Sequence, residues 1–384
     1  MMCRATDNPV ARLPEALPQL LHLTGTPRER GIQHGRHIGD TLVAYWAELL
    51  KDVGERAERP MTEAQLRTWI RSFAQKAEAA VPHLAEEVRG IAEGAGVPHE
   101  TALAVTFGEE IGHLASSLGC RSASASSQRC LSIVIPAAKS ATGSAILAQT
   151  WDGPDWTPPP LLFAVEEENG SQVFLADPGW VGGVGVNSRG LGSVHTGVLI
   201  KGSPAGLPYP FLVRRILEAS CLADGVAAAV DVSSTAGCHY IVCANDEVVD
   251  VESAGAVKAV LRCDGDYLST CAHFSDTRCI AEQTRPNDPV SMHRVARLLH
   301  LAEEGSTWAP LDVFELLADH APGPEGLCVC LHPGPGRSLA SIVMDPSAKR
   351  LWAKIGNPCG SAAILEVAVV GSGFETTPRD AATV

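Results

Sequence analysis

Apolar residues in the first third of the chain recur every three or four positions, which is the spacing of a helix with one buried face. The pattern is clearest in residues 42–53, 63–80 and 85–95. Thr62 precedes the second of these segments and can cap its first turn, and Gly96 follows the third and can end it. Residues 21–118 are therefore predicted to be mainly helical, after a loose lead-in over residues 1–20.

From residue 130 onward the pattern changes to short apolar runs separated by turn residues, which is typical of strands. Strands are predicted at 131–136, 144–151, 161–166, 172–176, 183–187, 192–199, 240–244, 248–252, 256–262, 326–332, 338–344, 350–355 and 364–370. Helical spacing returns at 209–219, 290–301 and 312–319. A helical segment followed by many strands with a few inserted helices predicts an α+β fold and not a parallel sheet of βαβ units.

The composition is that of a globular protein, since 45% of the 384 residues are hydrophobic and 19% are charged. The formal net charge of −14 makes nucleic acids and anionic membranes poor partners, because both carry negative charge. No apolar segment is long enough to span a bilayer or to resemble a signal peptide, so a cytoplasmic protein is expected. Its twelve cysteines are then expected to be reduced thiols.

Several common catalytic motifs are absent from the sequence. It contains no G-x-S-x-G elbow, no Walker A loop, no G-x-G-x-x-G after a strand, no H-E-x-x-H and no C-x-x-C. The sequence therefore lacks the usual motifs of serine hydrolases, nucleoside triphosphatases and dinucleotide-dependent oxidoreductases. Three hypotheses remain for this protein: a cysteine-dependent reaction, a metal site of unusual spacing, or no catalysis.

Cys130 stands at the head of the first predicted strand, directly after a Ser- and Ala-rich segment at 116–128 that is expected to form an accessible loop. If the bond between Arg129 and Cys130 is cut, Cys130 gains an α-amino group. The pKa of such an amine is about 8, so it can act as base for the thiol. The second strand of the hairpin ends at Trp151 and Asp152, which returns Asp152 to the side of Cys130. Asp152 could there orient the amine or a substrate.

Further along the chain, short segments follow one another in a characteristic order. They are LTGTPRERGIQHG at 23–35, QTWD at 149–152, PGWVGGVGVNSRGLG at 178–192, AHF at 272–274, DH at 319–320, LASIVMDP at 339–346 and GNPC at 356–359. Together with the Cys130 hairpin, they resemble the acyl-coenzyme A:6-aminopenicillanic acid acyltransferase family (isopenicillin N acyltransferase-like), a group of N-terminal nucleophile hydrolases.

The resemblance implies a four-layer αββα sandwich and a precursor that cuts itself before its nucleophile. Residues 1–129 would form a small helical chain and residues 130–384 a large strand-rich chain, and the two would stay together as one domain. The resemblance also implies an amidohydrolase or acyltransferase that forms an acyl-enzyme on Cys130 with Asp152 beside it. The expected substrate is a small amide or acyl thioester, with an amine as candidate acceptor, in secondary metabolism.

This chain departs from the family pattern at several positions. Arg129 stands where the family often has Gly, and a Gly-Cys pair at Cys120 leaves a second candidate nucleophile. Thr196, His239 and Ala272 stand where Asn is usual. Of these, Thr196 and His239 could still donate a hydrogen bond to an oxyanion or a substrate.

Three further residues, Trp151, Asn187 and His273, are candidates for substrate contacts because of their places in these motifs. Asn187 also suits a hairpin turn.

Two other hypotheses remain open. No cofactor and no metal are expected, but Cys328, Cys330 and His332 alternate so that they would share one face of a strand, which a zinc site could use. Alternatively, the lost Asn residues are compatible with an unprocessed cysteine enzyme or a small-molecule binding protein that has lost turnover.

Overall fold

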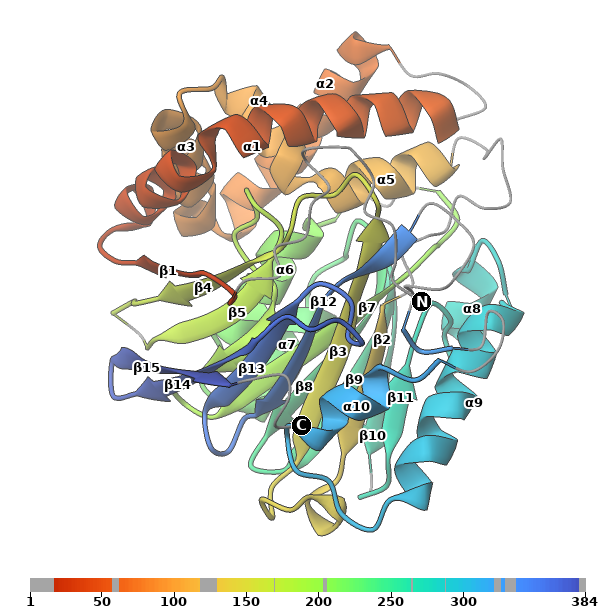
Figure 1. The fold of residues 1–384 in the computed structure, drawn as a ribbon. Coiled ribbons are helices and arrows are strands. Elements are labelled where there is room, and N and C mark those ends of the chain that lie inside the picture. The colour runs from red at the N-terminus through yellow and green to blue at the C-terminus, as the bar shows by residue number, and fades with distance from the viewer. Residues whose placement is uncertain are drawn as a thin grey trace.

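Two large β-sheets lie face to face at the centre of the computed structural model (Figure 1). It describes residues 17–56, 62–117, 130–168, 170–202, 206–263, 265–286, 288–320, 326–328 and 336–379. One sheet has eight strands, in the order β1 (Leu20–Leu23), β4 (Leu161–Val165), β5 (Gln172–Ala176), β6 (Val184–Asn187), β7 (Leu191–Val198), β8 (Gly237–Ala244), β9 (Glu247–Ala254) and β10 (Val257–Cys263). The other has seven, in the order β11 (Leu268–Thr270), β2 (Leu131–Ile135), β3 (Ile146–Pro154), β12 (Gly336–Asp345), β13 (Arg350–Ile355), β14 (Ile364–Val370) and β15 (Gly373–Arg379).

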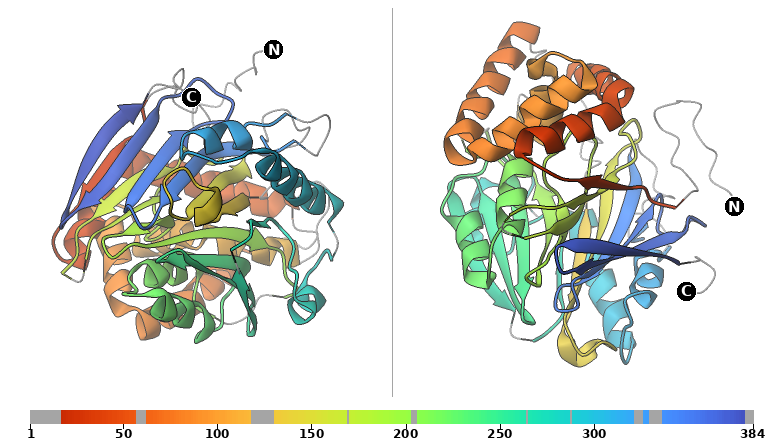
Figure 2. Two further views of the ribbon diagram at one scale, coloured as in Figure 1. Left: turned by 90° about the horizontal axis from the view of Figure 1, so that it is seen from below. Right: turned by 90° about the vertical axis from the view of Figure 1, so that its left-hand side faces the viewer.

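Helices cover the outer faces of both sheets, as the view from below shows (Figure 2). The eight-stranded sheet packs against α6 (Tyr209–Leu217) and α7 (Leu222–Val230), and α8 (Thr277–Glu282) lies against β9 and β10. The seven-stranded sheet packs against α9 (Pro289–Glu304) and α10 (Asp312–Leu317). The layer order is helix, sheet, sheet, helix, so the α+β class and the αββα sandwich are confirmed.

Five helices gather at one end of the sandwich, at the top of Figure 1. They are α1 (Pro27–Arg56), α2 (Glu63–Ala80), α3 (Pro82–Ala95), α4 (His99–Thr106) and α5 (Gly108–Ser117). Gly31 lets α1 approach α3 closely, because a Cβ atom there would lie 2.0 Å from the carbonyl oxygen of Glu87. For the described residues of 21–118 the expected helical character is confirmed, except that β1 contributes a strand, which pairs with β4 in parallel.

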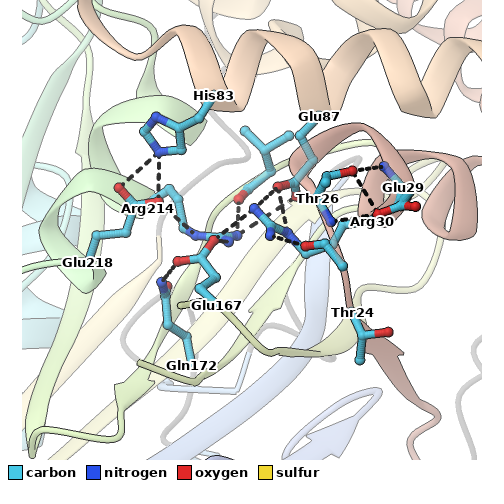
Figure 3. A network of polar contacts seen from close by, with 12 residues as sticks. Thr24, Thr26, Glu29, Arg30, His83, Glu87, Glu167, Gln172, Arg214 and Glu218 are labelled. Carbon is cyan, nitrogen blue, oxygen red and sulfur yellow. Dashed lines mark hydrogen bonds and ion pairs between the residues drawn. The ribbon is translucent and has the colours of Figure 1, made fainter. Parts of the chain in front are cut away.

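A buried ion-pair network joins these helices to the eight-stranded sheet (Figure 3). Arg30 on α1 pairs with Glu87 on α3 at 3.2 Å and with Glu167, which follows β4, at 3.0 Å. Arg214 on α6 pairs with the same Glu167 and lies 3.9 Å from Glu87. Both arginines are buried. The network therefore ties residues that precede position 130 to residues that follow it.

Two predicted segments differ from the structure. Residues 326–328 form no strand, and the remainder of the strand predicted at 326–332 lies outside the described residues. Ser116 and Ser117, the first two described residues of the loop predicted at 116–128, belong to α5 instead, and residues 118–129 also lie outside the described residues. Among the residues that the structure describes, no helix is long and apolar enough to cross a membrane.

Candidate active site

A small cavity of about 60 Å³ lies where the two sheets meet α1 and α5. Its walls combine aromatic rings with a few polar groups. The lining residues that matter below are Tyr45, Glu109, Cys130, Gln149, Trp151, Asp152, Asp177, Trp180, His195, Gly197 and Cys238. An apolar lining with few convergent polar groups is typical of a site for a small molecule.

Cys130 lies half-buried in the cavity wall, immediately before β2. The next residue, Leu131, pairs with Thr150 of β3, and the Cys130 thiol lies 3.8 Å from the main-chain carbonyl oxygen of Asp152. The hairpin thus brings Cys130 and Asp152 together. Burial, aided by the negative charge of Asp152, raises the pKa of the Cys130 thiol well above its usual range. In the uncut chain the sulfur is therefore held as a neutral thiol.

The carboxylate of Asp152 is fixed by two buried partners. Ser338 on β12 donates its hydroxyl to Oδ1 at 2.6 Å, and Arg294 on α9 donates to Oδ2 at 3.0 Å. The same guanidinium nitrogen of Arg294 also donates to the carbonyl oxygen of Leu327 at 2.7 Å. Burial acts to lower the pKa of Arg294, but the charges of Asp152 and Cys271 and the hydrogen bond to Asp152 together raise it, so the guanidinium stays charged.

Arg294 was missed by the sequence analysis, although a signal was available. It lies on the buried face of α9 together with Ser291, Leu298 and Ala302. A charged residue on the apolar stripe of a helix needs a buried partner. That partner, Asp152, lies on a distant strand, so sequence spacing alone could not identify it.

Gln149 presents an unused hydrogen-bond donor at the cavity. Its Oε1 accepts the main-chain N–H of His195 at 2.7 Å, which fixes the orientation of the amide because that N–H can only donate. Its Nε2 is buried and has no hydrogen-bond partner among the described residues. Because buried amide groups are almost always paired, this nitrogen is a candidate for contact with a ligand.

Trp151, a candidate for substrate contact, forms part of the aromatic wall. Its indole N–H donates to Oδ1 of Asp177 at 3.0 Å, and the hydroxyl of Tyr45 donates to Oδ2 at 2.8 Å. Its ring lies edge-on to Trp180 at a centroid distance of 5.8 Å. Burial raises the pKa of Asp177 to about 7, so this carboxyl changes its charge near neutral pH.

A second buried acid lies behind the cavity. Glu110 on α5 accepts the main-chain N–H of Tyr209 at 2.5 Å and the hydroxyl of Thr235 at 2.8 Å through Oε1. Its Oε2 has no hydrogen-bond partner in the described part of the chain. Burial raises the pKa of Glu110 to about 7, from an ordinary value of 4.5.

Replacement of Glu110 by Gln should change the free energy of unfolding more favourably at alkaline pH than at acidic pH. In wild type, the unfolded chain loses this proton above pH 4.5 but the folded chain keeps it to about 7. Wild-type stability therefore falls across that window, by about 3 kcal/mol from this group. Urea unfolding at pH 4.5 and pH 8, in a Cys130→Ala background, measures the difference. The exposed Glu375→Gln is the surface control, and an equal effect of Glu110→Gln at both pH values would contradict the prediction.

Thr196 and His239 were expected to supply oxyanion contacts, but neither lines the cavity. The Thr196 hydroxyl pairs with that of Thr270 at 2.8 Å, between the sheets. His239 uses both ring nitrogens, towards Asp250 at 2.8 Å and the carbonyl oxygen of His273 at 2.8 Å. Burial acts to lower the pKa of His239, but the charge of Asp250, its hydrogen bond and the charge of Glu252 together raise the pKa to about 9. The cavity is lined instead by Gly197, which follows Thr196, and by Cys238, which precedes His239. Successive residues on a strand face opposite sides of the sheet, so Thr196 and His239 point away from the cavity.

His273 and Asn187, two of the expected substrate contacts, also lie away from this cavity. The His273 ring pairs with the hydroxyl of Ser291 at 2.7 Å. Asn187 accepts main-chain N–H groups of Arg189 and Leu191 through its side-chain oxygen, and donates to carbonyl oxygens at the end of α6. It holds the β6–β7 turn, which is the structural role its position also suggested.

Four residues named in the sequence analysis cannot be placed. Arg129, the candidate cleavage position, and Cys120, the alternative nucleophile, lie outside the described residues, as do Cys330 and His332.

Comparison with known families gives one match that covers more than half of the chain. A sequence model described as acyl-coenzyme A:6-aminopenicillanic acid acyl-transferase matches residues 140–359. A curated relative from Emericella nidulans, the 40 kDa form of acyl-coenzyme A:6-aminopenicillanic-acid-acyltransferase, is 24% identical over 367 residues. The match covers 88% of this chain and 93% of the relative.

Comparison with solved structures gives partial overlaps. A mutant form of conjugated bile acid hydrolase from Clostridium perfringens is 9% identical with a TM-score of 0.47, and the overlap covers 66% of this chain and 97% of that one. Penicillin V acylase from Agrobacterium tumefaciens is 11% identical with a TM-score of 0.40, and the overlap covers 63% of this chain and 92% of that one.

Proposed function

The chain belongs to the acyl-coenzyme A:6-aminopenicillanic acid acyl-transferase family, and on this premise we propose that it is a self-processing amidohydrolase or acyltransferase with Cys130 as its nucleophile. The observation that carries this proposal is the placement of Cys130 at the head of β2, in the wall of the cavity and next to Asp152. The substrate class is a small amide or acyl thioester, in the setting of secondary metabolism.

Cleavage before Cys130 would convert an inert thiol into a nucleophile. The uncut chain has an amide nitrogen at this residue, and burial raises the pKa of the thiol. A free α-amino group, with a pKa of about 8, would accept the thiol proton and leave an ammonium beside the sulfur. This positive charge would favour the thiolate. The cut is therefore the activating step in the proposed mechanism.

The catalytic cycle then needs two acyl transfers. The sulfur of Cys130 attacks the acyl carbonyl, and its proton passes to the α-amine. The tetrahedral intermediate collapses, and the leaving amine or thiol takes that proton as the bond to the acyl carbon breaks. Water or a second amine then attacks the thioester, and gives the α-amine a proton that is returned to the sulfur. Asp152, held by Arg294 and Ser338, orients the ammonium through both steps.

Gln149 is the group best suited to stabilise the oxyanion. An oxyanion site needs a donor that is already oriented and shielded from water. The Nε2 of Gln149 is buried, is held in orientation by the bond from the His195 N–H to Oε1, and belongs to a residue in the cavity wall. This assigns to Gln149 the role that the sequence analysis considered for Thr196 and His239.

Replacement of Gln149 by Glu should lower kcat by about 100- to 1,000-fold, the usual cost of losing one oxyanion donor. Glu keeps the acceptor for the His195 N–H but puts a carboxylate oxygen where the amide nitrogen lay. Steady-state kinetics with p-nitrophenyl acetate measure the effect, and KM should change far less than kcat. Gln283→Glu is the matched control, because Gln283 is also buried and also accepts a main-chain N–H, from Phe274 at 3.0 Å. Equal loss in both variants would remove Gln149 from this role.

The proposal as a whole is tested by trapping the acyl-enzyme. Purified protein is mixed with p-nitrophenyl acetate, quenched in acid, and digested for mass spectrometry. The expected result is one acetyl group on the peptide that begins with Cys130. Protein whose thiols are first alkylated with iodoacetamide should carry no acetyl group on this peptide. Release of p-nitrophenol with the acetyl group on another residue, or with none bound, would mean that Cys130 is not the nucleophile.

A further inference from the structure

Three potential metal ligands meet away from the active-site cavity. They are His320, which follows α10, Cys328, which follows Leu327, and Cys359, which lies between β13 and β14. One ligand atom from each, a ring nitrogen or a sulfur, lies within 4.8 Å of the other two. None of the three side chains lines the active-site cavity. Two of them belong to the DH and GNPC segments, to which the proposed reaction assigns no role.

The distance between the two sulfurs fits shared coordination of one ion. The sulfur of Cys328 lies 3.5 Å from the sulfur of Cys359. With zinc–sulfur bonds of about 2.3 Å, two sulfurs on one tetrahedral ion lie about 3.8 Å apart. Two thiolates and an imidazole form a donor set that zinc prefers over hard cations such as magnesium or calcium.

The main chain around Cys328 is already held in place. The N–H groups of Leu327 and Cys328 both donate to the carbonyl oxygen of Asp319, at 3.1 and 3.2 Å. The carboxylate of Asp319 in turn accepts from Arg297 on α9 at 2.8 Å. Because Asp319 directly precedes His320, these bonds hold two of the three ligands near each other before any ion binds. A preformed site lowers the cost of ordering its ligands.

A buried ammonium group adjoins the two thiols. Lys354 on β13 donates to the carbonyl oxygen of Pro358 at 2.8 Å. Burial lowers the pKa of Lys354, whereas the neighbouring Cys359 and Cys328 act to raise it. Through its bond to Pro358, Lys354 holds the main chain directly before Cys359.

We propose that His320, Cys328 and Cys359 bind one Zn²⁺ ion, with solvent in the fourth position, at a structural site distinct from the active-site cavity. The site is linked to the proposed catalytic groups through Leu327, which directly precedes Cys328. The carbonyl oxygen of Leu327 accepts a hydrogen bond from Arg294, and Arg294 in turn holds Asp152. An ion on Cys328 would therefore fix the segment that positions Arg294. Sequence spacing suggested Cys328 with Cys330 and His332, and did not indicate His320 or Cys359.

Titration of the reduced, intact protein with Co²⁺ tests the site, because Co²⁺ occupies tetrahedral zinc sites and its bond to thiolate absorbs in the near ultraviolet. Wild type should show this band at one equivalent and lose it when Zn²⁺ is added. Cys328→Ser and Cys359→Ser should bind Co²⁺ at least ten-fold more weakly. Cys221→Ser, which replaces an exposed cysteine at the start of α7, is the matched control and should behave as wild type.

Thermal unfolding gives a second readout. Zn²⁺ should raise the Tm of wild type and of Cys221→Ser, but not that of Cys359→Ser, whose Tm without metal shows that it is folded. The absence of a thiolate band in wild type, or its persistence in Cys359→Ser, would overturn the proposal. So would reduced protein that binds no Co²⁺ while Cys328 and Cys359 form a disulfide on oxidation. The buried cluster of His239, Asp250 and Glu252 cannot mimic the band, because it contains no sulfur.

Discussion

Replacement of Cys130 by Ala should leave a single chain of 384 residues, whereas wild type should yield two fragments, residues 1–129 and 130–384. The alanine side chain has no sulfur to attack the preceding peptide bond, and none to carry an acyl group. Turnover should therefore fall by about 10⁴-fold or more, which is the scale of removing a covalent nucleophile. Intact mass of the denatured proteins and hydrolysis of p-nitrophenyl acetate measure the two effects.

Cys263→Ala is the matched control, because Cys263 is also half-buried but lies on β10, away from the cavity. It should be cut and should turn over as wild type does. A cut before Cys120 would move the nucleophile and the proposed roles around it. A single uncut chain in wild type would favour the alternative of an unprocessed cysteine enzyme or a small-molecule binding protein.

Replacement of Arg294 by Met should lower the free energy of unfolding by about 3–5 kcal/mol, because it leaves the buried carboxylate of Asp152 without its counter-charge. Met fills much of the same space, so the loss reports charge and hydrogen bonding more than packing. Cutting and turnover should be lost as well, since Asp152 would no longer be held beside Cys130. Urea unfolding in a Cys130→Ala background measures stability, and intact mass in the Cys130 background measures cutting.

Arg297→Met, on the same helix, is the control for this prediction. Arg297 pairs with Asp319 but is 34% exposed, so its loss should cost less than about 1 kcal/mol. Combining Arg294→Met with Asp152→Asn should cost less than the two single changes added together, because no unpaired charge remains. Additive effects would contradict the argument that an unpaired buried charge causes the loss.

Four elements were predicted from sequence to the residue. The helix Glu63–Ala80 and the strands Gln172–Ala176, Arg350–Ile355 and Ile364–Val370 are confirmed at both ends. The missed elements have weak local signals. β1 is interrupted by His22 and exists because it pairs in parallel with β4, while β11 and α7 are short and gain stability from packing on neighbouring strands and not from their own pattern.

The same distinction separates the predicted from the missed parts of the site. Cys130 and Asp152 meet through one hairpin, so local spacing was enough to place them side by side. Arg294 reaches Asp152, and Asp177 reaches the cavity, from segments outside this hairpin, which no spacing rule describes. The strand that contains Thr196 was predicted, whereas the strand predicted at 240–244 starts earlier, at Gly237, and so also contains His239. In neither case was the face of the strand predicted, and a difference of one residue on a strand reverses the direction of a side chain.

The parallel pairing of β1 with β4 has a consequence for making the large fragment by itself. A gene for residues 130–384 would omit β1, and β4 would become an open edge with unpaired main-chain N–H and C=O groups. It would also omit Arg30 and Glu87, and so leave Glu167 and Arg214 uncovered. An exposed strand edge beside uncovered apolar surface favours aggregation. The nucleophile-bearing fragment should therefore be obtained in soluble form only when residues 1–129 are present during its folding.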